Sequence, residues 1–203
     1  MKKFSYLFTF DLKLQQFFFF LPFVAYALAI LCIYISPDEN RDYIFFQVLA
    51  VSFCGVHLLL HYSYLFDEGA NEILLPYYRQ TAWLDLLRYG LVDGLCIAIV
   101  FCFVDPFFHT PQVVAHTILL ALCYFLGSSA LLMIIKNLEI TISCILVYTI
   151  MEISTQGTFM PWPHIFFFVY PYVDLWVRLT YISLVIGLIL SIVIISRFYI
   201  TRK

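Results

Sequence analysis

The chain has 203 residues, of which 64% are hydrophobic and 12% charged, and its mean hydropathy is +0.95. Soluble domains are about 45–50% apolar, so a water-soluble fold of this size could not bury so much apolar surface. The formal net charge of −2 argues against nucleic-acid binding. The composition therefore predicts an all-α membrane protein, with residues 1–203 forming a single transmembrane domain.

Residues 1–16, MKKFSYLFTFDLKLQQ, begin with two lysines. Asp11 and Lys13 interrupt the apolar run and no small-residue cleavage site follows, so we do not expect a cleaved signal peptide. The apolar residues fall broadly on one side of a helix: Phe4, Leu7, Phe8, Leu12 and Leu14. This pattern predicts an N-terminal interfacial helix, with a mobile tail as the alternative.

Six apolar segments reach or approach the roughly 20 residues that a membrane-spanning helix needs. They are Phe17–Ile35, Ile44–Phe66, Trp83–Val104, Val113–Ile135, Ile140–Ile153 and Leu175–Ser196. The fifth segment is short for a helix that crosses alone. The six cysteines lie inside these runs without a C-x-x-C pair, which predicts reduced packing residues.

Residues 154–173, between the fifth and sixth segments, are apolar but contain one glycine and three prolines. Unpaired backbone groups are costly in lipid, so such a segment should be buried in protein or lie at the interface. We predict an external re-entrant or interfacial helical hairpin, with an ordinary external loop as the alternative.

The basic residues predict the orientation in the membrane. With the N-terminus inside, the inner face carries nine of them: Lys2, Lys3, Lys13, Arg79, Arg88, Lys136, Arg197, Arg202 and Lys203. The outer face carries only Arg41 and Arg178. The positive-inside rule then places both termini in the cytoplasm of a multi-pass protein of a bacterial-type cell membrane.

The segment 66–80, between the second and third spans, gathers Asp67, Glu68, Glu72 and Arg79. Acidic residues early and a basic residue late suit the dipole of a short helix. We expect this helix to end near Pro76 and to lie under the membrane on the cytoplasmic side.

With these residues in view, the chain resembles a permease subunit of the ABC-2 type, the type V family of ABC transporters. Members carry, after span two, an acidic residue and a glycine, then threonine, a second acidic residue, two leucines and a proline. Glu68, Gly69, Glu72, Leu74, Leu75 and Pro76 fit this order. The sequence departs from it at Ala70 and Asn71, and Pro76 follows Leu75 directly.

The resemblance implies a cytoplasmic coupling helix that an ATPase contacts, formed by Asp67, Glu68, Gly69, Glu72, Leu74, Leu75, Pro76 and Arg79. The chain has no G-x-x-x-x-G-K-[ST] motif, so ATP and Mg would bind a separate subunit. Two ATPase chains would join two permease chains, either a homodimer or a related heterodimer. The expected cargo of such an exporter is a peptide, antibiotic, lipid or other amphipathic compound.

Ionisable residues inside spans are costly and often functional. His57 and His61 are four residues apart on one helical face, and Asp93 lies at the same depth as His57 on the next span. We predict a structural His57–Asp93 pair, or alternatively a transport or ligand site. Glu152, near the outer end of the fifth span, is the candidate for meeting a cationic cargo, with a water-facing structural role as the alternative.

Two further functions remain open at this point. A haem-exporter-like permease of cytochrome c maturation would explain the two histidines. A non-ATP intramembrane protein, such as an immunity or assembly factor or a lipid-acting enzyme, would share the hydropathy. No catalytic constellation and no metal-binding motif is present in the sequence, so we expect a transport subunit without a metal, cofactor or active site of its own.

Overall fold

The computed structural model describes residues 9, 12–13, 15–36, 39–66, 70–156, 164–168 and 174–200. Within these ranges the chain is helical and contains no strand. Five helices are long and apolar enough to cross a membrane: Gln16–Ile35, Arg41–Ser63, Pro111–Ile135, Leu138–Thr155 and Leu175–Phe198. They confirm an all-helical protein of the membrane class.

The first two spans are composite. The 3-10 helix η1 (Gln16–Phe20) leads into α2 (Leu21–Ile35), with Pro22 accommodated in the first turn of α2. The second span runs through α3 (Glu39–Phe45), the π-helix η2 (Phe46–Ala50), η3 (Val51–Phe53), α4 (Val56–Ser63) and η4 (Tyr64–Phe66). The sequence predicted a span at Ile44–Phe66, and the structure has a candidate span at Arg41–Ser63 whose helix is interrupted at Cys54 and Gly55.

Helix α5 (Ala70–Phe101) has 32 residues and starts inside the predicted coupling segment. It continues through Pro76, so the expectation that this proline ends a separate short helix is wrong. Proline removes one backbone donor, but its fixed φ is compatible with a helix, and the bonds on either side carry the helix onward. The structure therefore joins the coupling segment and the third predicted span in one element.

The remaining helices begin and end at recognisable caps. Helix α6 (Pro111–Ile135) follows η5 (Pro106–Phe108) and starts at Thr110, whose hydroxyl accepts from the Val113 N–H. Lys136 ends α6 in the left-handed conformation, and Asn137 caps α7 (Leu138–Thr155) by accepting from the Ile140 N–H. Helix α8 (Asp174–Ile200) closes the bundle.

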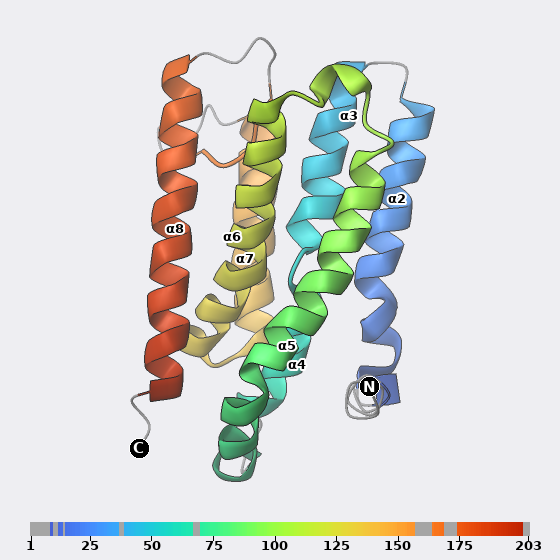
Figure 1. Ribbon diagram of the computed structural model, residues 1–203. Coiled ribbons are helices and arrows are strands. Elements are labelled where there is room, and N and C mark those ends of the chain that lie inside the picture. Colours follow the sequence, from blue (N-terminus) through green and yellow to red (C-terminus); the bar gives the residue numbers. More distant parts are fainter. Residues whose placement is uncertain are drawn as a thin grey trace.

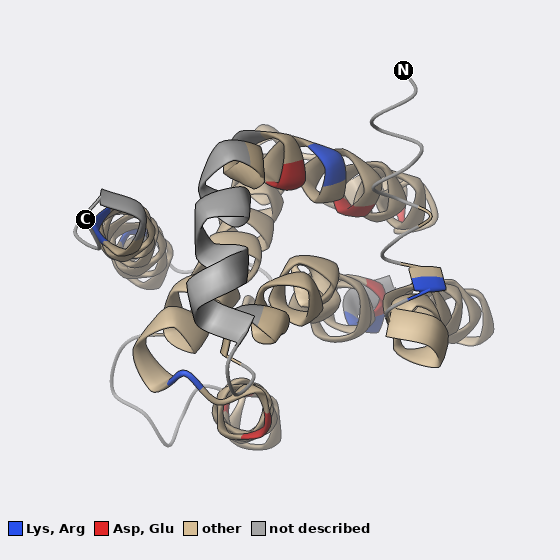
Figure 2. Cartoon of the chain, turned by 90° about the horizontal axis from the view of Figure 1, so that it is seen from below, with Lys and Arg blue, Asp and Glu red and all other residues tan. Residues whose placement is uncertain are grey.

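The helices form two groups that meet at α6 (Figure 1). One group contains α2, α3, α4 and α5, and the other contains α6, α7 and α8. Helix α6 packs most extensively on α8 and also contacts α4 and α7, while α2 packs on η2, α3 and α5. Seen from below, charged positions are few among the helices (Figure 2), as a lipid-facing bundle requires.

Two expected elements fall largely outside the described residues. Of the N-terminal interfacial helix, 1–16, the structure describes only Thr9, Leu12, Lys13, Gln15 and Gln16. Of the predicted hairpin, 154–173, it describes 154–156 and 164–168, so the rest of the hairpin lies outside the described residues. Residues 164–168 have no regular secondary structure and bend at Phe166, and Phe166 and Phe167 are buried. All six cysteines are free thiols, as predicted.

Candidate functional site

A break in the second span creates the centre of the site. Gly55 has φ of 88°, and α4 begins at the next residue, Val56. A Cβ at position 55 would lie 2.6 Å from the Phe125 Cα of α6, so only glycine suits both this backbone and this close approach. The break leaves backbone N–H groups at the start of α4 inside the bundle.

The carboxylate of Asp93, from α5, lies at the start of α4, beside these backbone N–H groups. Its Oδ2 accepts from the Gly55 N–H at 2.9 Å, and its Oδ1 accepts from the Tyr26 hydroxyl at 3.2 Å. His57 Nδ1 lies 2.8 Å from the same Oδ1, and both side chains are fully buried. The predicted His57–Asp93 pair is therefore confirmed as a contact, and it joins three helices, α2, α4 and α5.

The hydrogen-bond network fixes the protons of this pair. His57 Nε2 lies 3.0 Å from the Phe19 carbonyl oxygen, which can only accept, so Nε2 carries a hydrogen. Nδ1 and Asp93 Oδ1 then share one further proton at 2.8 Å. The pair is net neutral whichever atom holds that proton, which makes its full burial tolerable.

A second cluster lies closer to the start of α5. Asp85 Oδ1 accepts from Arg88 at 3.0 Å, and its Oδ2 accepts from the Thr81 hydroxyl at 2.9 Å. His61 Nε2 lies 3.3 Å from the same Oδ2. Arg88 is 1% exposed, so this guanidinium, one of the nine basic residues assigned to the inner face, is buried inside the protein.

Tyr89 links the two clusters. Its ring stacks on His57 at 6.0 Å and lies 5.4 Å from the ring of His61, while the Arg88 guanidinium sits 4.4 Å above it. The result is a buried polar path along the α4–α5 interface. A displacement of α5 would change these contacts together.

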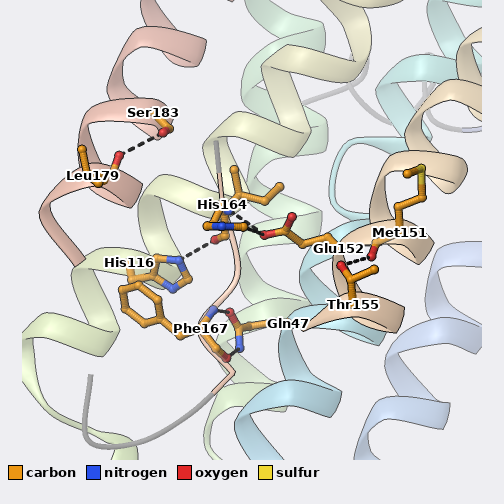
Figure 3. A network of polar contacts seen from close by, with 10 residues as sticks. Gln47, His116, Met151, Glu152, Thr155, His164, Phe167, Leu179 and Ser183 are labelled. Carbon is orange, nitrogen blue, oxygen red and sulfur yellow. Dashed lines mark hydrogen bonds and ion pairs between the residues drawn. The ribbon is translucent and has the colours of Figure 1, made fainter. Parts of the chain in front are cut away.

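A third polar cluster holds residues 164–168 against α3, η2, α6 and α7 (Figure 3). The Gln47 carboxamide pairs with Phe167 as a neighbouring strand would, donating to its carbonyl and accepting from its N–H, both at 2.9 Å. His116 Nε2 donates to the Ile165 carbonyl at 2.8 Å. The His116 ring also stacks on Phe167 with centroids 3.8 Å apart.

Glu152 belongs to this cluster. It is fully buried, and its Oε1 accepts from the Ile165 N–H at 3.0 Å and lies 3.4 Å from His164 Nδ1. The expectation of a water-facing residue is therefore wrong. The carboxylate of Glu152 instead accepts a hydrogen bond from a backbone N–H of the bent segment 164–168.

The predicted coupling residues divide into two sets. Asp67, Glu68 and Gly69 lie outside the described residues. Glu72, Leu74, Leu75, Pro76 and Arg79 lie in the first turns of α5, where the structure describes the backbone only. Among the described residues, no group of three or more histidine, cysteine, aspartate or glutamate side chains is arranged to hold a metal ion.

Sequence reasoning did not identify Gln47, Asp85, Arg88 and His116 as buried members of these clusters. Asp85 and Arg88 gave a usable signal, because two opposite charges three residues apart near the start of a span indicate a buried pair. No protein-family model, no curated protein and no solved structure matches the chain.

Proposed function

We propose that the chain is the membrane-spanning permease subunit of an ATP-driven exporter of the ABC-2 type. The observation that carries this proposal is the continuity of α5. One helix contains both residues 70–80 of the coupling segment and the buried residues Asp85, Arg88 and Asp93. A push on its first turns would reach the centre of the membrane through a rigid element.

We also propose α5 as a sixth span, beside the five apolar ones. Asp85, Arg88 and Asp93 are buried in the protein, while an exposed stripe follows α5 at spacings of three and four residues: Leu84, Leu87, Leu91, Leu95 and Ile99. This division is typical of a helix with one face in lipid and the other in a polar interface. The six spans would leave both termini in the cytoplasm.

The assembly that we propose contains two permease chains, identical or related, and two copies of an ATPase subunit that binds ATP and Mg. The cargo would be a peptide, antibiotic, lipid or other amphipathic compound leaving the cytoplasm. The expected contact surface for the ATPase is the segment 66–80, with Glu68 and Glu72 as its acidic residues.

The haem-exporter alternative receives less support from the geometry. An axial ligand needs a free imidazole nitrogen, but both ring nitrogens of His57 have hydrogen-bond partners, Asp93 and the Phe19 carbonyl. The carboxylate oxygens of Asp93 are likewise engaged, which disfavours a general base for a lipid-acting enzyme.

A position-specific crosslink tests the proposal. A photoreactive amino acid is placed at Glu72 in the full chain, the cells are irradiated, and the adduct is identified by mass spectrometry. We expect an adduct with a protein that carries the G-x-x-x-x-G-K-[ST] motif and hydrolyses ATP. The same probe at Phe107, an exposed residue of η5 beyond the opposite end of α5, should give no such adduct.

The charge-reversal variant Glu68→Lys/Glu72→Lys provides the second readout. It should lower ATP hydrolysis by the crosslinked partner in the purified complex, whereas Arg178→Gln should leave it unchanged. Crosslinking at position 72 to proteins without an ATPase motif, together with unaltered ATP hydrolysis in the charge-reversed complex, would contradict the proposal.

A further inference from the structure

A pocket of about 630 Å³ lies at the lower end of the bundle, outside the three polar clusters. Residues of η1, of α4 and η4, and of the turn between α6 and α7 line it. Four of the five apolar spans begin or end at a residue that lines this pocket or adjoins one that does: Gln16, Ser63, Ile135 and Leu138. The pocket therefore lies at the boundary between lipid and water. This position follows from the ends of the spans and does not depend on the proposed ATPase partner.

Gln15 gives the first sign of a ligand. Its side chain lines the pocket and is 3% exposed, and neither Nε2 nor Oε1 has a hydrogen-bond partner among the described residues. Leaving a buried polar group unsatisfied costs about 1–3 kcal/mol. A carboxamide in such a position has two donors and one acceptor oxygen to offer a polar ligand.

Charge on the pocket wall indicates the kind of ligand. Lys136, in the left-handed position that ends α6, and Glu139, in the first turn of α7, both line the pocket and are exposed. An anion alone would meet the carboxylate of Glu139, and a cation alone would meet Lys136. A zwitterion satisfies both, with its anionic group at Lys136 and the N-terminus of the 18-residue α7, and its cationic group at Glu139.

The apolar part of the wall completes the match. Phe17 and Phe18 line the pocket and are 76% and 62% exposed, at the end of the first span. Large aromatic side chains at this depth contact the upper parts of lipid acyl chains. Leu60 and Phe66 extend the same apolar surface on the opposite wall.

We propose that this pocket binds the headgroup of phosphatidylethanolamine, a zwitterionic phospholipid with one phosphate and one primary ammonium group. The phosphate accepts hydrogen bonds from Lys136 and the Gln15 amide. The ammonium donates to Glu139, and Phe17 and Phe18 contact the acyl chains. The ammonium hydrogens distinguish this lipid from phosphatidylcholine, whose trimethylated nitrogen has no hydrogen to donate.

Native mass spectrometry of the purified full chain in detergent tests the proposal. Phosphatidylethanolamine, phosphatidylcholine, phosphatidylglycerol and inorganic phosphate are titrated separately, and the bound fraction is measured. We expect phosphatidylethanolamine to bind at least about fivefold more tightly than each of the other lipids. Lys136→Gln and Glu139→Gln should each weaken it by at least about fivefold, since each removes one charge-assisted contact.

Both variants change exposed side chains, so folding should be preserved, and circular dichroism checks this. Gln15→Leu adds a third variant that should weaken the phosphate contact. The matched control is Arg178→Gln, which removes an exposed charge at the other end of the molecule and should leave lipid binding unchanged. Equal binding of phosphatidylethanolamine and phosphatidylcholine, full displacement of the lipid by inorganic phosphate, or wild-type binding by both charge variants would each overturn the proposal.

Discussion

The N–H of Gly55 donates to the carboxylate of Asp93 across 2.9 Å, so a side chain of α5 caps the helix that begins after the break in the second span. A carboxylate at a helix N-terminus is favoured by the helix dipole and by unpaired backbone donors. The contact makes the geometry of α4 depend on the position of α5. This dependence is the physical link between the start of α5 and the interior of the bundle.

Asp93→Asn should destabilise the protein by about 3–5 kcal/mol, the range for breaking a buried ion pair. The amide nitrogen of asparagine cannot accept, so the Tyr26 hydroxyl and a protonated His57 Nδ1 lose the acceptor that Asp93 Oδ1 supplies. Thermal unfolding of the purified chain in detergent measures the effect. In a double-mutant cycle with His57→Phe, the second substitution should cost much less in the Asp93→Asn background, and strictly additive costs would contradict the coupling.

Gly55→Ala should cost about 3 kcal/mol or more, because it combines a left-handed backbone with a methyl group 2.6 Å from the Phe125 Cα. The matched control is Gly94→Ala on α5, where an added Cβ meets nothing within 4 Å. This control should be neutral or stabilise the fold by up to about 1 kcal/mol. Equal melting temperatures for the two variants would refute the argument.

Arg88→Met should leave the buried Asp85 carboxylate without its guanidinium partner and destabilise the fold by about 3–5 kcal/mol. Asp85→Asn combined with Arg88→Met removes both charges and should recover a large part of this loss. Denaturation of the two variants and the wild type under the same conditions gives the comparison. A double variant less stable than Arg88→Met would show that the pair is not the cause.

Gln47→Leu should release residues 164–168, because it removes both hydrogen bonds to Phe167. Losing these bonds should raise the rate of hydrogen exchange at the Phe167 amide by roughly tenfold or more. Hydrogen–deuterium exchange with mass spectrometry measures this rate. Gln112→Leu, an exposed position on α6, should leave it unchanged, and identical exchange in the two variants would argue against the contact.

The His57–Asp93 pair could be predicted from the sequence, because two ionisable residues at equal depth on consecutive spans have few other partners. Span boundaries were also predictable, since hydropathy reports them directly. The bounds of α6 and α8 differ from the predicted segments by only a few residues at either end.

The break at Gly55 was not predictable, because the run Ile44–Phe66 has the same hydropathy whether its helix is continuous or interrupted. What requires glycine there is the distance to Phe125, which arises only when α4 packs on α6. The burial of Glu152 was not predictable either, because it also depends on packing between segments that are distant in the sequence. Its partner, the Ile165 N–H, is a backbone group that no residue pattern reveals.

The way in which residues 164–168 are held has a consequence for which sequences the position accepts. Glu152 and Gln47 accept hydrogen bonds from the backbone N–H groups of Ile165 and Phe167. These bonds do not depend on the side chains at 165 and 167. Alternate residues of the segment thus donate their backbone N–H groups in one direction, as in a β-strand, but the acceptors are side-chain oxygens and not a neighbouring strand. Proline should be rejected at 165 and 167, where a donor is required, yet the same contacts place no such demand on 166.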